Sequence, residues 1–178
     1  MATVDTPNTA RHAWPPAAAV LLGTLVAGTL DIGYAIVVSG LRGVSALTVL
    51  QSVASGLLGK ESYDGGTTSA LLGGVLHYAM MAAFVLAFFV LSRLWPALLR
   101  QPFGWGALYG VGVFCVMNYV VVPLSAIGHV IHRAALSSLL GELFSHVVFV
   151  GMTIGWITSR ARTSAAAHPG TPGPVPPR

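Results

Sequence analysis

The feature that most restricts the fold of this chain is a set of four long apolar stretches, near residues 16–39, 70–94, 104–124 and 136–159. Each has about 20 or more residues, which is the length of helix that a hydrocarbon core of ~30 Å requires. Backbone polar groups cannot stay unpaired in lipid, so stretches of this length are predicted to be membrane-spanning helices. The sequence therefore predicts an all-α fold, an integral membrane four-helix bundle.

Charged residues are scarce, and their positions support this interpretation. Only 8% of the residues are charged, whereas a soluble domain usually has about 25%. Inside the four stretches the charged residues are Asp31, Arg93 and Glu142, and Arg93 is at an end where it can reach the lipid headgroups. The other Lys and Arg residues occur singly beside apolar runs, which is typical of membrane proteins and argues against nucleic-acid binding. The expected partner is the lipid bilayer.

The distribution of cations predicts the orientation of the four spans. On one side of the membrane, the tails and the second loop contain Arg11, Arg93, Arg100, Arg160, Arg162 and Arg178. The other side contains Arg42, Lys60 and Arg133, together with the acidic Glu61 and Asp64. Cytoplasmic loops are enriched in Lys and Arg, so both termini are expected in the cytoplasm.

The first loop on the opposite side contains a further helical segment, near residues 44–58, which is too short to span a membrane. One helical stripe is apolar and consists of Leu47, Leu50, Ala54, Leu57 and Leu58. The opposite stripe is polar and consists of Ser45, Thr48, Gln51, Ser52 and Ser55. This pattern predicts an amphipathic or re-entrant helix. We expect it to pack over the bundle as a cap, because it lacks the Lys/Arg-rich face of a headgroup-binding helix.

The two ends of the chain differ in composition from the apolar region. Residues 1–13 are mostly polar, and residues 161–178 are rich in Pro, Gly and Ala. Segments of such composition do not form a packed core. We therefore expect a disordered tail on either side of a single transmembrane domain, residues 14–160.

Small residues at a spacing of four recur in three of the spans. The third span contains Gly106 and Gly110, the fourth contains Gly151 and Gly155, and the first contains Ala19, Gly23 and Ala27. Lipid supplies no hydrophobic drive for helices to associate, so small faces that let backbones approach closely favour a tight bundle. The Gly106/Gly110 or Gly151/Gly155 faces could instead support a homo-oligomer.

Strongly polar residues from all four spans are predicted to form a layer at one depth. Its members are Asp31, His77, Asn118, Glu142 and His146, with Tyr34 beside them. At 1.5 Å per residue, Asp31 lies about 5 Å and His77 about 7 Å from the midpoints of their spans, both toward the non-cytoplasmic side. His146 follows Glu142 by one helical turn and lies on the same helical face.

Ionisable groups inside a membrane are costly unless they find partners. The cost is about 2.5–3.5 kcal/mol for a charged residue at the membrane centre on insertion scales. Asp31 and Glu142 are therefore expected to face the interior of the bundle. The imidazoles of His77 and His146 could be their partners, by hydrogen bonding when neutral or by charge when protonated.

Three interpretations of the polar layer are open. It could be a hydrogen-bonded network that sets the register of the helices. It could bind or relay protons, ions or a small polar solute, because intramembrane carboxylates and histidines mark such pathways. It could also bind zinc, manganese or iron through Asp31, His77, Glu142 and His146. Haem held by His77 and His146 is disfavoured, because the depths of these residues differ by about 5 Å.

We favour a non-enzymatic membrane protein whose polar layer is a binding site for a proton, ion or solute, with Asn118 and Tyr34 in support. No cofactor is predicted. The alternatives are a structural or accessory subunit that docks partner helices and a metal- or haem-binding membrane enzyme. His129 and His132 in "GHVIHR" lie in a loop, where a surface metal site is an alternative to simple solvation.

Three segments, in this order, resemble a group of small bacterial inner-membrane proteins. They are "LVAGTLDIGYA", "VLQSVASGLLGK" and "GALYGVGVFCVMNYVVVPLSA". The group is loosely YagU-like, and the resemblance extends over residues 20–160. It implies a location in the bacterial inner membrane. The link of some YagU-like proteins to acid tolerance would fit a proton-sensitive layer, but the resemblance assigns no site residues.

Overall fold

The computed structural model describes residues 14–128 and 136–162 of the chain. Every regular element in these residues is a helix, which confirms the predicted all-α class. The predicted N-terminal tail, residues 1–13, lies outside the described residues, as does the predicted C-terminal tail beyond Arg162. His129 and His132 also lie outside the described residues.

Four helices are long and apolar enough to cross a membrane, as expected for a multi-pass membrane protein. Two of them are continuous α-helices, α1 (Pro16–Gly40) and α3 (Gly66–Leu94). Pro16 suits the first position of α1, because the amide hydrogen that proline lacks has no partner there in any case. Helix α3 begins before its apolar stretch does, because the polar residues 66–69 continue the helix at its end.

The third and fourth spans each contain a wide π-helical segment. In chain order, their elements are α4 (Pro102–Val116), η3 (Met117–Val121) and α5 (Val122–Leu124), then α6 (Leu136–Ser145), η4 (His146–Met152) and α7 (Thr153–Arg162). In a π-helix the backbone hydrogen bonds join residues i and i+5, and such segments are frequent at functional sites. Hydrophobic periodicity did not predict either segment. Asn118 lies in η3 and His146 begins η4, so both segments belong to the polar layer.

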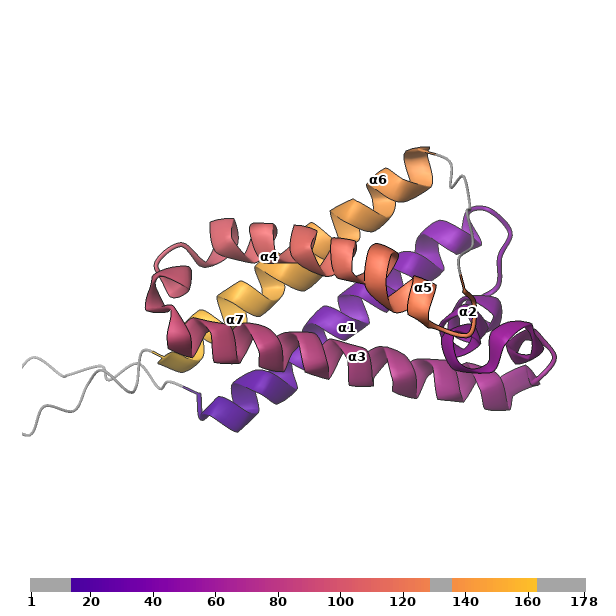
Figure 1. The fold of residues 1–178 in the computed structure, drawn as a ribbon, viewed down its shortest axis with the longest axis horizontal. Helices are drawn as coiled ribbons and strands as arrows, with labels where there is room; N and C mark the ends of the chain where they lie inside the picture. Colours follow the sequence, from indigo (N-terminus) through magenta and orange to yellow (C-terminus); the bar gives the residue numbers. More distant parts are fainter. Residues whose placement is uncertain (1–13, 129–135, 163–178) are drawn as a thin grey trace, which may run out of the picture.

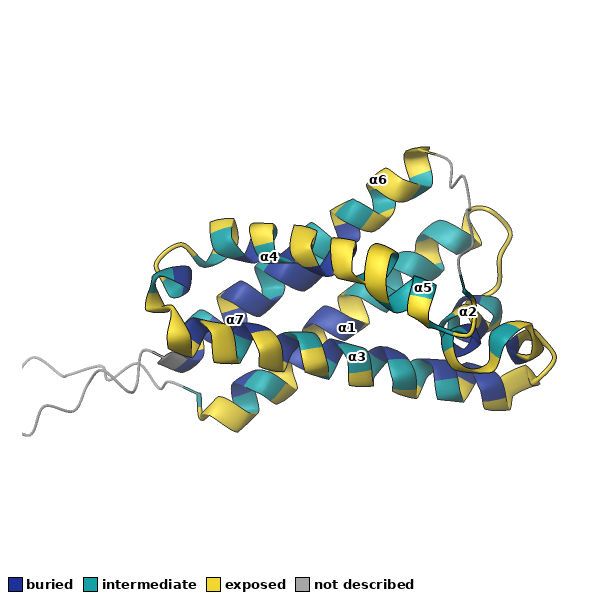
Figure 2. Ribbon diagram, in the orientation of Figure 1, coloured by how far each residue is buried: buried dark blue, intermediate teal, exposed yellow. Residues whose placement is uncertain are grey.

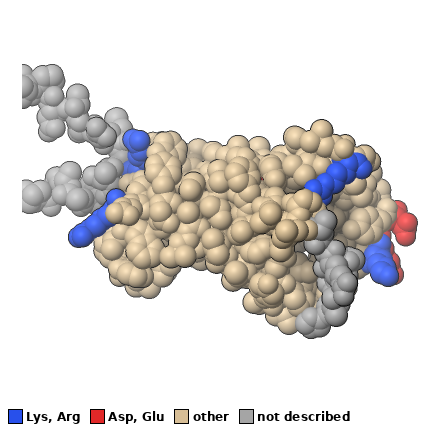
Figure 3. Space-filling model, turned by 90° about the horizontal axis from the view of Figure 1, so that it is seen from above, with Lys and Arg blue, Asp and Glu red and all other residues tan. Residues whose placement is uncertain are grey.

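The two ends of the bundle are distinct (Figure 1). At one end, here called the terminal end, α1 begins, α7 ends, and η2 (Pro96–Leu99) connects α3 to α4. At the other, here called the α2 end, lie α2 (Ala46–Leu58) and η1 (Gly59–Tyr63). On the face shown in Figure 3, charged side chains occur toward the ends and the surface between them is uncharged. This distribution is the one expected of a protein that spans a bilayer.

The apolar core occupies the centre and the terminal half of the bundle. Its buried members are Ala27, Met81, Val85, Phe88, Leu98, Val113, Val150 and Ile154. In Figure 2 the buried positions follow the inward sides of the helices, whereas exposed positions cover the outer faces. Large side chains such as Leu71 and Leu108 are exposed there, as expected for contact with lipid. At the α2 end, α6 diverges from α5 and α2 (Figure 1).

The two GxxxG motifs pack against each other within the chain. A Cβ atom added to Gly106 would lie 2.5 Å from the carbonyl oxygen of Gly151. One added to Gly110 would meet backbone atoms of His146, and one added to Gly151 would meet backbone atoms of Gly106 and Gly110. Gly155 is equally close to α4. In this structure each of the two faces therefore packs against the other, and a homo-oligomer through them stays a prediction.

Helix α2 forms over nearly the predicted residues, and Gln51 and Ser55 of its polar stripe are buried. Ser45 caps it by accepting a hydrogen bond from the amide of Thr48 at 3.1 Å. Gln51 is buried, and its Nε2 lies within 3.3 Å of the carbonyl oxygens of Tyr63 and Gly66 and of Ser69 Oγ. These contacts attach α2 to the start of α3.

The apolar stripe of α2 is divided between the protein and the outside. Ala54 is fully buried, and α2 approaches α3 so closely at Gly73 that an added Cβ would meet the backbone of Leu50. Leu47 and Leu57 are exposed. The helix therefore turns its hydrogen-bonding groups toward the bundle and presents leucines outward, which suits a helix in contact with lipid.

Candidate functional site

A cavity of about 470 Å³ lies at the α2 end of the bundle. Its walls come from α1, α2, α3, η3, α5, α6 and η4. Of the predicted site residues, Asp31, Tyr34, His77, Glu142 and His146 line it. Asn118 joins the same group through a hydrogen bond to Glu142. The structure therefore brings the predicted polar layer together around one space.

Asp31 of α1 is held by a serine of the fourth span. Ser145 Oγ donates a hydrogen bond to Asp31 Oδ1 over 2.5 Å. Ser145 is buried and ends α6, immediately before the π-helical segment η4. A hydrogen bond to a carboxylate is shorter and stronger than one between neutral groups, so this contact links α1 to α6 at the depth of the layer.

His77 of α3 is directed by the backbone of α1. It is 7% exposed, and its Nε2 lies 2.9 Å from the carbonyl oxygen of Gly28. A carbonyl oxygen only accepts hydrogen bonds, so Nε2 carries the proton. In neutral His77 the other nitrogen, Nδ1, is then an acceptor. An added Cβ at Gly28 would lie 2.8 Å from the Tyr78 ring, so glycine permits this close approach of α1 and α3.

Glu142 of α6 is bonded to the third span. Asn118 Nδ2 donates to Glu142 Oε1 over 3.1 Å and also to the carbonyl oxygen of Phe114 over 3.1 Å. The bond to Phe114 orients the amide group of Asn118 along its own helix. Glu142 is exposed and Asn118 is half-buried. This pair joins the third and fourth spans on the cavity side.

His146 is oriented by its own helix. Its Nδ1 lies 2.9 Å from the backbone oxygen of Glu142, one turn earlier, so Nδ1 carries the proton and Nε2 is the acceptor in the neutral ring. The ring also packs edge-on against Phe114, with centroids 6.0 Å apart. Both imidazoles thus have their tautomer selected by a backbone carbonyl group.

The suggested pairing of imidazoles with carboxylates is wrong for this structure. Among the described residues, Asp31 and Glu142 receive hydrogen bonds from a hydroxyl and an amide, and both imidazoles bond to carbonyl oxygens. The physical reason is that each imidazole already has a backbone acceptor at 2.9 Å, the carbonyl oxygen of Gly28 for His77 and that of Glu142 for His146. Among the described residues, the carboxylates and imidazoles share a cavity without a hydrogen bond between them.

The metal hypothesis receives no support from the arrangement of possible ligands. Within residues 14–128 and 136–162, no three His, Cys, Asp or Glu side chains are placed so as to hold one metal ion. Asp31, His77, Glu142 and His146 are distributed around the cavity wall instead.

Two residues of the site were missed by the sequence analysis. Arg42, counted only as a loop cation, lines the cavity and donates from Nη1 to Ser138 Oγ over 2.9 Å. Ser145 was not among the predicted site residues. Its position three residues after Glu142 places both on one helical side, which is a signal that could have identified it.

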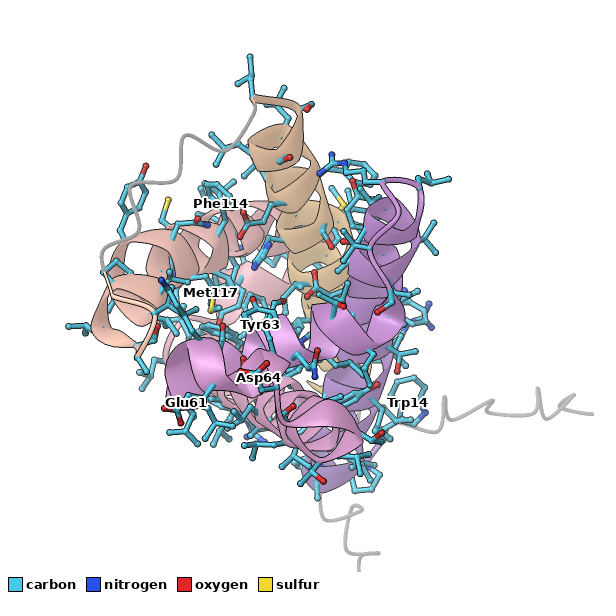
Figure 4. The ribbon with its side chains drawn as sticks, turned by 90° about the vertical axis from the view of Figure 1, so that its right-hand side faces the viewer. Trp14, Glu61, Tyr63, Asp64, Phe114 and Met117 are labelled. Carbon is cyan, nitrogen blue, oxygen red and sulfur yellow. The ribbon has the colours of Figure 1, made fainter. Side chains whose placement is uncertain are left out.

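The cavity also has apolar walls and a smaller extension. Val38, Val53, Met80 and Val121 line it between the polar groups. Seen from the α2 end, Met117 points toward the middle of the bundle, whereas Glu61 lies at its edge (Figure 4). A chamber of about 30 Å³ adjoins it, lined by Asp31, His77 and His146 and by core residues, and a space of this size can hold a water molecule.

The fold and this cavity define the class of the protein: an α-helical, multi-pass membrane protein with a polar cavity between its spans. Comparisons with family models, with curated protein sequences and with solved structures find no match to the chain.

Proposed function

We propose that this chain is a non-enzymatic protein of the bacterial inner membrane whose cavity binds a small solute or ion from the periplasmic side. The observation that carries the proposal is that Asp31, His77, Glu142 and His146, from three different spans, line one cavity of about 470 Å³. Ligand pockets typically measure about 300–1,000 Å³. A purely structural polar layer would be filled by its own side chains, and a proton relay would not require this volume.

The orientation rests on the charges at the two ends. Arg93, Arg100 and Arg160 lie in or beside the terminal end, whereas Arg42 and Lys60 at the α2 end are balanced by nearby acidic residues. The positive-inside rule then places both termini in the cytoplasm and the α2 end in the periplasm. The resemblance to YagU-like proteins supports the same membrane.

The exposed leucines of α2 support a lipid-contacting cover for the cavity. Val49, Ser52, Val53 and Gly56 of α2 line its wall. The α2 helix is attached to the third span as well, because the carbonyl oxygen of Gly56 accepts a hydrogen bond from the amide of Ala126 over 2.8 Å. The cover is thus fixed on two sides, at the start of α3 and after α5.

Cysteine labelling tests whether the cavity is open to the periplasm. On a background with Cys115→Ser, Ala35→Cys places a thiol in the cavity wall of α1. Ala79→Cys is the matched control, because Ala79 is an exposed alanine of α3 two residues after His77. In intact cells, a membrane-impermeant maleimide should label Ala35→Cys and leave Ala79→Cys unlabelled. Equal labelling of the two, or none at Ala35→Cys, would show that no periplasmic opening exists.

Filling the cavity tests whether it binds a solute. Ala35→Trp should occupy the space beside Asp31 without adding or removing charge. A panel of small cations, anions and neutral solutes is added to the purified protein, and thermal stability is measured. At least one solute should raise the melting temperature of the wild type and not of Ala35→Trp. If every solute acts equally on both proteins, the cavity is not their binding site.

A further inference from the structure

The hydrogen bonds around the cavity leave it with an excess of acceptors. His77 Nε2 and His146 Nδ1 are committed as donors to backbone carbonyl groups. The opposite nitrogens of both neutral rings, Nδ1 and Nε2 respectively, can therefore only accept. Both histidines line the cavity. Each imidazole thus contributes an acceptor and no further donor to a ligand.

The two carboxylates add to this excess. The hydrogen bonds from described residues reach Asp31 Oδ1, from Ser145, and Glu142 Oε1, from Asn118. The second oxygen of each carboxylate receives no hydrogen bond from the described residues. An ionised carboxylate is an acceptor with about four lone-pair sites, so each can still accept from a ligand.

The formal charge of the cavity wall is negative, which like the excess of acceptors favours a positively charged donor. Among its described lining residues, Arg42 is the sole Lys or Arg, against the two carboxylates of Asp31 and Glu142. Arg42 is exposed, bonds to Ser138 on α6, and lies just after the end of α1. It is therefore beyond Asp31 along the chain, toward the α2 end. With neutral imidazoles the described lining residues carry a formal net charge of −1, and among them Asp31 lies deeper in the cavity than the one cation, Arg42.

The remaining wall is largely apolar. Ile32, Val38, Val53, Met80 and Val121 contribute valine, isoleucine and methionine side chains between the polar groups. A bare metal ion would leave these surfaces unused, and no three potential metal ligands converge in the described part of the chain. A ligand that matches the wall combines a donor-rich positive group with an apolar body.

The geometry points to a small organic ammonium ion, with N–H groups toward Asp31, Glu142 and the two imidazoles, as the ligand of this cavity. This inference rests on the proposed function, which requires only that a solute binds. It adds the sign of the charge, the need for N–H donors, and the apolar body of the ligand.

Four ligands that share a benzyl or phenyl group but differ in their polar end test the inference. They are benzylammonium, benzyltrimethylammonium, benzyl alcohol and benzoate, titrated into the purified protein in lipid nanodiscs by calorimetry, with empty nanodiscs as the blank. Benzylammonium should bind most tightly. Binding by benzyltrimethylammonium at equal affinity would overturn the requirement for N–H donors. Equal or tighter binding of benzyl alcohol or benzoate would overturn the requirement for positive charge.

Neutralising one carboxylate tests whether Glu142 and Asp31 bind the ammonium group. Glu142→Gln keeps the shape and the hydrogen bond from Asn118, and it should weaken benzylammonium binding about 10-fold or more, because a charge-assisted contact becomes a neutral one. Asp31→Asn should act in the same direction. Glu61→Gln is the matched control, because Glu61 is an exposed carboxylate of η1 at the same end of the bundle. The affinity of the Glu61→Gln protein for benzylammonium should stay within about 2-fold of the wild type.

The possible failures are distinguishable. If Glu142→Gln and Glu61→Gln change the affinity equally, the carboxylate does not contact the ammonium group and the inference is wrong. If benzylammonium does not bind at millimolar concentration, the inference is wrong, whereas labelling of Ala35→Cys still decides whether the cavity is open. If Asp31→Asn does not fold, Glu142→Gln alone decides, because Glu142 is exposed and the fold does not depend on its burial.

Discussion

Gly106 allows the packing beneath the cavity to be tested quantitatively. In Gly106→Ala, the new Cβ would lie 2.5 Å from the carbonyl oxygen of Gly151 and 3.0 Å from Met152 Cα. An ordinary contact begins near 3.4 Å, so the deficit is about 1 Å. The obstructing atoms belong to the backbone and cannot rotate away. The α4 helix and η4 must therefore separate.

The cost of this separation follows from packing energetics. A radial gap of 0.5–1 Å forfeits about a quarter to a half of the attraction between the facing atoms. Overpacking a close contact typically costs about 1–3 kcal/mol. Because the same interface includes Gly110, Gly151 and Gly155, we expect Gly106→Ala to lower the free energy of unfolding by about 2–3 kcal/mol. The shift would also move His146, whose backbone faces Gly110.

The assay is equilibrium unfolding in mixed micelles of a nonionic detergent and increasing sodium dodecyl sulfate, followed by tryptophan fluorescence. Trp105 is adjacent in the chain and packs against Trp95 in a tilted arrangement, with ring centroids 5.2 Å apart. Gly112→Ala is the control, because it is on the same helix and an added Cβ there meets nothing within 4 Å. It should leave stability unchanged or raise it by up to about 1 kcal/mol. If Gly106→Ala were no more destabilising than Gly112→Ala, the described α4–η4 contact would be refuted.

Three further predictions address the layer, the cover and the orientation. Ser145→Ala removes the donor to Asp31 and should cost about 1–3 kcal/mol of stability in the same unfolding assay, since a carboxylate loses a hydrogen bond; no loss would mean that the bond is not formed. Gln51→Ala removes the buried amide that attaches α2, and amide hydrogen exchange should then accelerate in α2 and not in α4; unchanged exchange would contradict its anchoring role. On the Cys115→Ser background, a cysteine at Lys60 should react with an impermeant maleimide in intact cells and one at Arg100 should not; the opposite pattern would invert the proposed orientation.

Much of the fold could be predicted because membrane spans are a property of local composition. The length of an apolar stretch is compared with one fixed dimension, the thickness of the hydrocarbon core. The four spans therefore fall close to their predicted bounds, and α2 forms over Ala46–Leu58 where an amphipathic pattern marked residues 44–58. The depth of a polar residue also follows from counting along a helix, which is why Asp31, His77 and Glu142 were expected at one level.

The partners within the layer could not be predicted from depth alone. The rotation of each helix about its axis decides whether an imidazole reaches a carboxylate or a carbonyl oxygen. The π-helical segments η3 and η4 change that rotation within a span, and nothing in the hydrophobic pattern of the third or fourth stretch indicated them. Ser145 and Arg42 gained their roles only through contacts with residues distant in the chain.

The sequence by itself determined how many times the chain can cross a membrane, where each crossing lies, and at what depth the polar side chains sit. Only the tertiary structure decided that the two GxxxG faces meet each other, that α2 buries Gln51 and Ser55 of its polar stripe, and that the polar groups surround a cavity. The physical reason is that lipid favours the apolar length of each helix but is indifferent to its rotation. Rotation is set by close packing and by hydrogen bonds between helices, and those exist only once all the helices are assembled.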